Sequence, residues 1–71
     1  MNNPGLEIWV VYDNPTDFPG LFIARKWVGE TPTQELLQAE TLEQLRAKLP
    51  RGLVRLDRHS GDDAKIVETW L

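Results

Sequence analysis

The chain has 71 residues and no cysteine, so it can form one small domain but no disulfide bond or thiolate metal site. Its net charge of −3, with 27% charged and 41% hydrophobic residues, is typical of a folded globular protein and argues against a general affinity for nucleic acid. The longest apolar run, residues 8–11, is too short to span a membrane, and the N-terminus lacks a signal-peptide pattern. We therefore expect a single cytoplasmic domain over residues 1–71, with a frayed N-terminus over residues 1–5 and no membrane contact.

The first half of the chain predicts a β-hairpin. Residues 6–12, LEIWVVY, are β-branched, aromatic and apolar at nearly every position, which predicts a strand covered on both faces. Residues 21–28 predict a second strand, in which the neighbours Arg25 and Lys26 point to opposite faces, so that this strand lies at an edge or has one side open to solvent. Residues 13–20 predict a loop whose end is a type II turn, with Pro19 second and Gly20 third.

Residues 29–40 are compatible with two structures. A helix that begins at Pro32 fits the helical propensity of QELLQAE. However, one helix over residues 32–49 would scatter Leu36 and Leu37 away from the leucines that follow. We therefore predict a short strand over residues 34–39 and keep the helix as the alternative.

Residues 41–52, TLEQLRAKLPRG, predict a short helix with a defined start and end. Thr41 and Gln44 have the spacing of a capping box, in which each side chain bonds the other residue's backbone N–H. Three leucines spaced three and four residues apart share one face, and Pro50 followed by Gly52 ends the helix. Because a helix of about two turns is marginal in water, we expect the leucine face to lie on a sheet.

The last third of the chain predicts two more strands. These are residues 53–56 and 64–71, joined by a turn over residues 57–63, with Ile66 and Trp70 on one face of the last strand. The expected fold is therefore α+β, with an antiparallel or mixed sheet of four to five strands, one helix packed on one face, and the order β-β-(β)-α-β-β.

No residue pattern in the chain predicts catalysis. His59 is the only histidine, and the residues around it that could act with it are Asp57, Ser60, Asp62 and Asp63. A metal site or a small hydrolase can be drawn from these side chains, but one histidine in a turn lacks the fixed geometry and supporting hydrogen bonds that either needs. We expect a solvated turn, no metal, no cofactor and no enzyme activity.

Three tryptophans are many for so short a chain, and each lies on a predicted strand. They either fill a small core or form part of a partner surface, where tryptophan and arginine are enriched. Arg25 shares a strand face with Trp27, so this pair is the preferred contact patch. The candidate partner-binding residues on the strands are Arg25, Trp27 and Trp9.

Charge is distributed unevenly along the chain. Residues 1–45 have a net charge of −5 and residues 46–71 a net charge of +2. The second value comes from one basic stretch over residues 46–58: Arg46, Lys48, Arg51, Arg55 and Arg58. We expect a solvated face that pairs with the acidic first half. The alternative is that Arg51, Arg55 and Arg58 contact a partner or phosphates, although the aromatic residues of a single-strand binder are missing there.

Most of the chain resembles small uncharacterised proteins of bacterial and phage genomes. The segments that carry this resemblance are residues 9–27 (WVVYDNPTDFPGLFIARKW), 42–56 (LEQLRAKLPRGLVRL) and 66–71 (IVETWL). It implies a cytoplasmic protein and assigns no activity. DFPG at residues 17–20 and TLEQL at residues 41–45 are also similar to small antitoxins with a partial ribonuclease-H-like fold, but the gap between the two is longer here, so no residue role follows.

These observations favour a non-catalytic protein-interaction module that binds a protein partner or forms a homodimer. The lack of a catalytic constellation and the two-sided apolar strands support this hypothesis. The alternative is an antitoxin-like or phage regulatory protein that contacts nucleic acid through residues 46–58.

Overall fold

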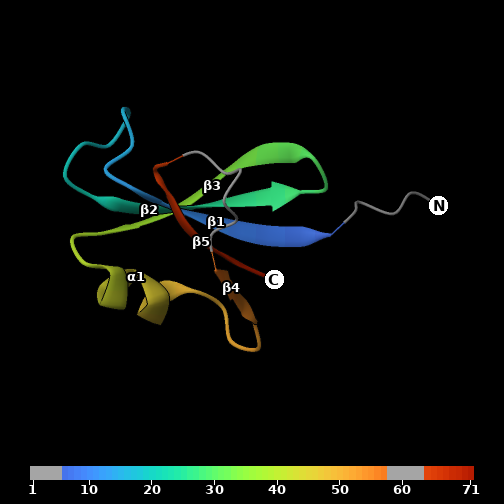
Figure 1. Cartoon of the computed structure of the whole chain (residues 1–71). Coiled ribbons are helices and arrows are strands. Elements are labelled where there is room, and N and C mark those ends of the chain that lie inside the picture. Colours follow the sequence, from blue (N-terminus) through green and yellow to red (C-terminus); the bar gives the residue numbers. More distant parts are fainter. Residues whose placement is uncertain (1–5, 58–63) are drawn as a thin grey trace.

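The protein is an α+β domain with a five-stranded antiparallel sheet and one short helix (Figure 1), which confirms the predicted fold class. The computed structural model describes residues 6–57 and 64–71. The elements in chain order are β1 (Glu7–Asp13), β2 (Phe22–Val28), β3 (Thr31–Ala39), α1 (Leu42–Lys48), β4 (Arg55–Asp57) and β5 (Ile66–Trp70). In this part of the chain no helix has the length and apolar character needed to cross a membrane.

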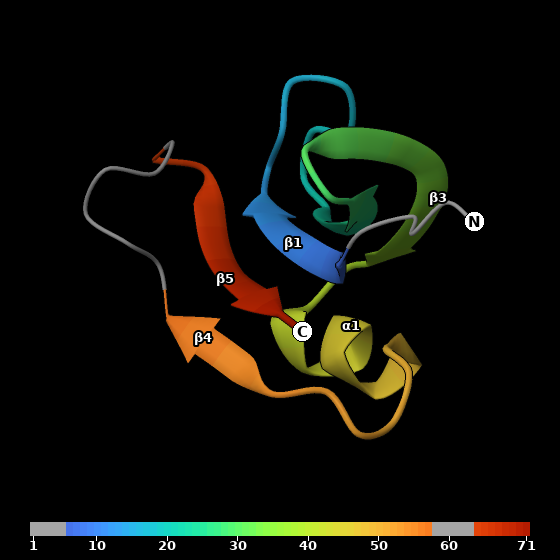
Figure 2. The same cartoon turned by 90° about the vertical axis from the view of Figure 1, so that its right-hand side faces the viewer.

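The strands lie in the order β3-β2-β1-β5-β4, so the most apolar strand, β1, is at the centre of the sheet. β1 pairs antiparallel with β2 on one side and with β5 on the other. Both views place α1 on one side of the twisted sheet (Figures 1 and 2). A central strand in such a sheet must be apolar on both faces, which is the pattern that residues 6–12 show.

The loop between β1 and β2 confirms the predicted type II turn. The Leu21 N–H donates to the Phe18 carbonyl at 3.3 Å, and Gly20 has φ +80°, as the third residue of that turn requires. Asn14 adopts φ +53° and its Oδ1 accepts from the Gly20 N–H at 2.7 Å. The loop is thus closed by its own hydrogen bonds at both ends.

The β2–β3 connection shows that the helical alternative for residues 32–49 is wrong. β3 begins at Thr31, before the residues 34–39 predicted as strand, and continues to Ala39. Val28 pairs with Thr31 across a two-residue loop, and Gly29 at its first position has φ +61°. Glycine at this position favours a type II′ hairpin turn. The Gly29-Glu30 pair is therefore a sequence signal for β3 that the prediction did not use.

α1 begins and ends where predicted, and of the two predicted capping-box hydrogen bonds the structure shows the one to Thr41. The Thr41 Oγ1 accepts from the Gln44 N–H at 3.1 Å, and the helix stops at Lys48 because Leu49, before Pro50, is extended. Leu45 is fully buried and Leu49 nearly so. These leucines pack with the sheet residues Val11, Ala24 and Ala39, and this cluster is the core.

The C-terminal strands differ in detail from the prediction. β4 spans Arg55–Asp57 rather than residues 53–56, because Leu53 turns in to pack against the core. Asp57 ends this strand instead of opening the turn, and the rest of the predicted turn, residues 58–63, lies outside the described residues, as does the predicted frayed segment over residues 1–5. Val54 and Leu71 still exchange two backbone hydrogen bonds, which extends the β4–β5 pairing.

The prediction that Ile66 and Trp70 share one face of the last strand is wrong. Val11 pairs with Glu68 but its neighbour Tyr12 pairs with Ile66, so Val67 is an extra residue in β5. Such a bulge shifts the alternation by one residue. Trp70 therefore lies on the same face as Val11, and Ile66 lies on the opposite face with Tyr12.

The N-cap of α1 yields a test of the helix. Replacing Thr41 with Ala removes the acceptor of the Gln44 N–H and should lower the free energy of unfolding by about 1 kcal/mol. Thr41→Ser keeps the hydroxyl and should retain most of the stability. Urea titrations measure both; an unchanged midpoint in Thr41→Ala would show that the cap contributes nothing.

Candidate functional site

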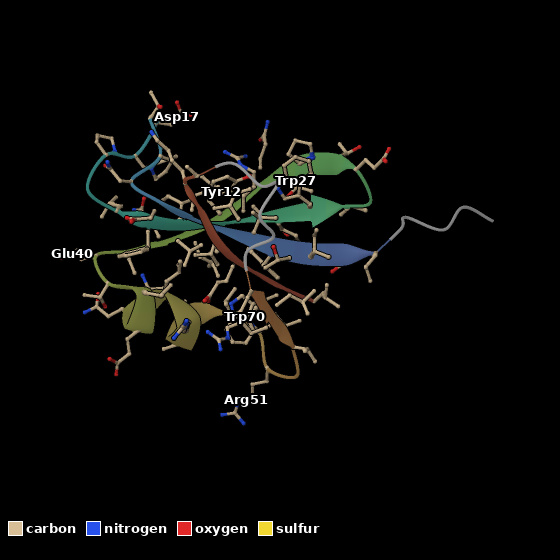
Figure 3. All side chains as sticks on the ribbon, in the orientation of Figure 1. Tyr12, Asp17, Trp27, Glu40, Arg51 and Trp70 are labelled. Carbon is tan, nitrogen blue, oxygen red and sulfur yellow. The ribbon has the colours of Figure 1, made fainter. Side chains whose placement is uncertain are left out.

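The two faces of the sheet have different surroundings. One face, called here the closed face, is covered by α1 and includes Trp9, Val11, Ala24, Glu68 and Trp70. Figure 3 shows Trp70 on the side of the sheet where α1 lies, and Tyr12 and Trp27 on the other side. This second side, called here the open face, has no helix over it in residues 6–57 and 64–71.

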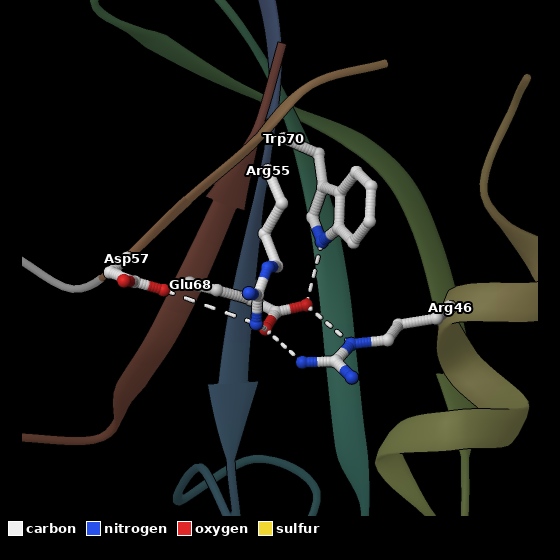
Figure 4. Close-up of polar contacts among 5 residues, drawn as sticks. All are labelled: Arg46, Arg55, Asp57, Glu68 and Trp70. Carbon is white, nitrogen blue, oxygen red and sulfur yellow. Dashed lines mark hydrogen bonds and ion pairs between the residues drawn. The ribbon is translucent and has the colours of Figure 1, made fainter. Parts of the chain in front are cut away.

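Glu68 is the polar centre of the closed face (Figure 4), with only 2% of its surface exposed. Arg46 in α1 donates to both of its carboxylate oxygens, from Nε at 3.0 Å and from Nη2 at 2.6 Å. The Trp70 indole N–H donates to Oε2 at 2.6 Å. Arg55 on β4 lies 3.7 Å from Oε1 and 3.9 Å from the carboxylate of Asp57. Both oxygens of the buried carboxylate thus accept hydrogen bonds, three in all, and two arginines balance its charge, as burial of a carboxylate demands.

The surroundings keep Glu68 ionised. Burial by itself raises the pKa of Glu68, but the hydrogen bonds from Arg46 and Trp70 and the positive charges of Arg46 and Arg55 outweigh it, so the pKa lies below its usual value. The same hydrogen bond raises the pKa of Arg46 against the opposing effect of burial. A carboxylate held ionised by fixed cations ties α1 to β5 and is poorly suited to accept or donate protons in catalysis.

Sequence reasoning missed this cluster. Glu68 is the acidic residue inside the apolar stretch IVETWL, and its cations come from the basic stretch that was expected to be a solvated face. An acid amid apolar strand residues, with arginines elsewhere in the chain to pair with it, is the signal that could have found it. Lys26 forms a second, more exposed cluster with Glu35 and Glu7, at 3.0 and 3.1 Å, and these bonds raise its pKa.

The open face is largely apolar across all five strands. The strand pairing places together, in the described part of the chain, Leu6, Ile8, Val10, Tyr12, Ile23, Arg25, Trp27, Pro32, Leu36, Gln38, Val54, Leu56, Ile66, Thr69 and Leu71. Among these positions only Arg25 is charged. Part of this layer is already buried, since Val10 is 8% and Ile23 is 2% exposed, so only its remaining side chains can form a surface.

The large apolar side chains that stay exposed all lie on the open face. In residues 6–57 and 64–71 they are Leu6 at 63%, Val54 at 60%, Leu56 at 47% and Leu71 at 37%. Val54 pairs with Leu71, and Leu56 pairs with Thr69, so three of them are neighbours at the β4–β5 side. Single exposed leucines are ordinary, but several adjacent ones on one face mark an interaction surface.

The other end of the open face is covered by the β1–β2 loop. Pro15 and Phe18 of that loop lie over the strands and help to reduce the exposure of Ile23 to 2%. A small pocket of about 140 Å³ remains there, lined by Tyr12, Pro15, Asp17, Phe18, Ile23 and Arg25. The open face is therefore partly covered at this end, while Val54, Leu56 and Leu71 at the β4–β5 side stay exposed.

The structure distributes the predicted strand residues over both faces. Arg25 and Trp27 are partly buried on the open face, and the Arg25 guanidinium donates to the Thr33 carbonyl at 2.7 Å. The indole N–H of Trp27 is buried without a hydrogen-bond partner in the described part of the chain. Trp9 is packed against the core on the closed face, apart from the other two.

The basic stretch is mostly engaged within the molecule. Arg46 and Arg55 surround Glu68, and the Lys48 Nζ donates to the Gln38 carbonyl at 2.6 Å. Arg51 is exposed in the turn before β4 and forms no ion pair with the described residues. Arg58 lies outside the described residues, so the three arginines proposed for phosphate contact are not all placed.

The hypothesis of a metal or hydrolase site around His59 also concerns residues outside the described part of the chain. His59, Ser60, Asp62 and Asp63 lie outside the described residues, and Asp57 is exposed at the end of β4. Within residues 6–57 and 64–71, no group of three or more potential His, Asp or Glu metal ligands is assembled.

Comparison of the chain with protein-family models, with curated proteins and with solved structures finds no match. The resemblances drawn from the sequence therefore stay predictions.

The Glu68 cluster yields a test of stability against pH. Arg46→Met leaves a buried carboxylate with a weaker set of partners and should lower the free energy of unfolding by about 2 kcal/mol at pH 7, a value kept modest because Arg46 is 38% exposed. The pKa of glutamate in the unfolded chain is about 4.3, and the pKa of Glu68 in the folded chain is lower. The stabilisation is thus complete above the unfolded pKa and is lost as the pH falls through the folded pKa.

The control is Lys48→Met, which removes an exposed cation from the same helix and should cost well under about 1 kcal/mol. Chemical unfolding of both variants from pH 7 down to about pH 2.5 measures the difference. A difference between Arg46→Met and wild type that persists undiminished at the lowest pH would contradict the assigned role of Glu68.

Proposed function

We propose that this protein is a non-catalytic interaction module that binds a protein partner, or another copy of itself, through the open face. The observation that carries this proposal is that the exposed large apolar side chains gather on one face of the sheet. Covering the exposed part of a leucine such as Leu56, which is 47% exposed, stabilises a complex by about 1 kcal/mol. Several such residues side by side favour association over isolated exposure.

The sheet edges are less suited to a partner than the open face. The β3 edge has two occupied carbonyl groups, since Lys48 donates to Gln38 and Arg25 donates to Thr33. The β2–β3 pairing is also irregular between Arg25 and Trp27 of β2, whose partners on β3 are Leu36 and Pro32. The other edge strand, β4, has only three residues. Occupied carbonyls, bulges and short strands are the means by which proteins prevent strand addition at an edge, so the face is the better binding surface.

The alternative, a nucleic-acid contact through residues 46–58, has less support. Phosphate binding requires arginines and lysines that are free to neutralise it. Arg46 and Arg55 already partner a buried carboxylate, and withdrawing them would leave that charge uncompensated. A basic-stretch contact would appear as salt-dependent retardation of DNA or RNA that is lost on Arg51→Ala.

A photo-reactive amino acid can test the proposal in the native host. Placed at Leu56 on the open face, it should cross-link to a protein on illumination, because a bound partner would lie within van der Waals contact of this side chain. The matched control places the same group at Ala47, an exposed position in α1. Mass spectrometry of the products identifies what was captured.

A specific adduct at Leu56 and none at Ala47 is the expected result. No specific adduct at Leu56, or equal adducts at both positions, would contradict an interaction role for the open face.

A further inference from the structure

We propose that the occupant of the open face is a second copy of this chain, packed face to face in a two-fold dimer; this rests on the interaction role proposed above and names the partner. The charge of the face is the first reason. Of the strand positions on it, only Arg25 is charged, and its guanidinium already donates to Thr33 of its own chain. The strand positions of two such faces can meet without burying carboxylates, although each chain has a net charge of −3. The carboxylate at the loop end of the face is that of Asp17, which lines the small pocket there with Arg25.

The order of the strands makes the face complementary to itself. A two-fold axis that runs along the central strand β1 places β4 of one copy over β3 of the other, and β5 over β2. Residues that pair with one another from strand to strand form a cross-strand row, and one such row consists of Leu56, Thr69, Val10, Arg25 and Leu36. Leu56 and Leu36 are at its two ends, so the two-fold places Leu56 of one copy over Leu36 of the other. Leu71 faces Trp27 in the next row.

This arrangement also accommodates Arg25. Arg25 shares a cross-strand row with Thr69, which lies on the other side of β1. The two-fold therefore brings each Arg25 over the hydroxyl of Thr69 in the second copy, not over the other Arg25. An axis that crossed the strands at this row would set the two arginines against one another, and like charges in a dry interface are unfavourable. The charge thus favours the axis along β1 over an axis that crosses the strands at the row of Arg25.

The area of the face suits a weak, reversible dimer. The five strands have nine, seven, seven, five and three residues, and at about 3.4 Å per residue and about 4.8 Å between strands they span roughly 500 Å² per copy. Because the β1–β2 loop already covers one end, two copies would bury at most about 1,000 Å², which is the lower limit for a biological interface and lies below the standard size of about 1,600 Å². We therefore expect monomer and dimer to exchange in a concentration-dependent manner.

Sedimentation equilibrium of the full chain, from about 1 μM to about 1 mM, tests the proposal. The wild type should shift from monomer to dimer over this range. Leu56→Glu and Val54→Lys should each raise the dissociation constant of the dimer by at least about tenfold, because each would bury a charge in the interface. The two charges have opposite sign, so an equal effect would come from burial and not from the overall charge. Ala47→Glu adds the same charge as Leu56→Glu on the exposed side of α1 and should leave the dimer unchanged. Circular dichroism confirms that each variant is folded.

The two-fold itself is tested with a photo-reactive group at Leu56 in a mixture of unlabelled and ¹⁵N-labelled chains. The expected product joins the two isotopic forms and maps to residues 31–39 of the second chain. A strict monomer at the highest concentration, a dimer unaffected by both open-face variants, or adducts confined to residues 54–57 of the second chain would each overturn the proposal. A monomer that still captures a different protein at Leu56 in the host would refute the second copy alone and leave the interaction role intact.

Discussion

The pairing of the buried Glu68 carboxylate with Arg46 is the interaction on which the rest of this fold depends. A carboxylate that is 2% exposed must have cations and donors beside it, and the strongest of these comes from α1. The leucines of α1 supply apolar burial over the middle of the sheet, while Arg46 sets where the helix lies relative to β5. The short helix is therefore held on one particular face, and the opposite face is left without it.

This asymmetry explains the character of the surface. The described part of the chain has apolar residues on both faces of its central strands but a single helix with which to cover them. The β1–β2 loop covers one end of the open face with Pro15 and Phe18, and no described element covers the β4–β5 side. A small domain that leaves leucines together on one face is less stable alone than it would be in a complex, which connects the fold to an interaction role.

Particular residues show how far the sequence could be read. The type II turn at Gly20 and the N-cap at Thr41 were predicted, because each depends on side chains a few residues apart. β3 was predicted too short, since the turn-forming Gly29-Glu30 pair was not used. The site was harder to predict: Arg25 and Trp27 do share the open face, but Trp9 lies on the closed face, and the Glu68 cluster was not foreseen.

The amino-acid pattern alone determined the class of β1, β2 and α1, the start and end of α1, and the presence of a strand apolar on both faces, but it left β3 open between strand and helix. These properties follow from local periodicity and backbone geometry. Only the tertiary structure decided which side chains meet. The extra residue at Val67 moves Ile66 to the open face, and the Arg46–Glu68 bond joins residues 22 positions apart. Register and long-range charge pairing depend on the whole sheet being assembled, so no local window of sequence contains them.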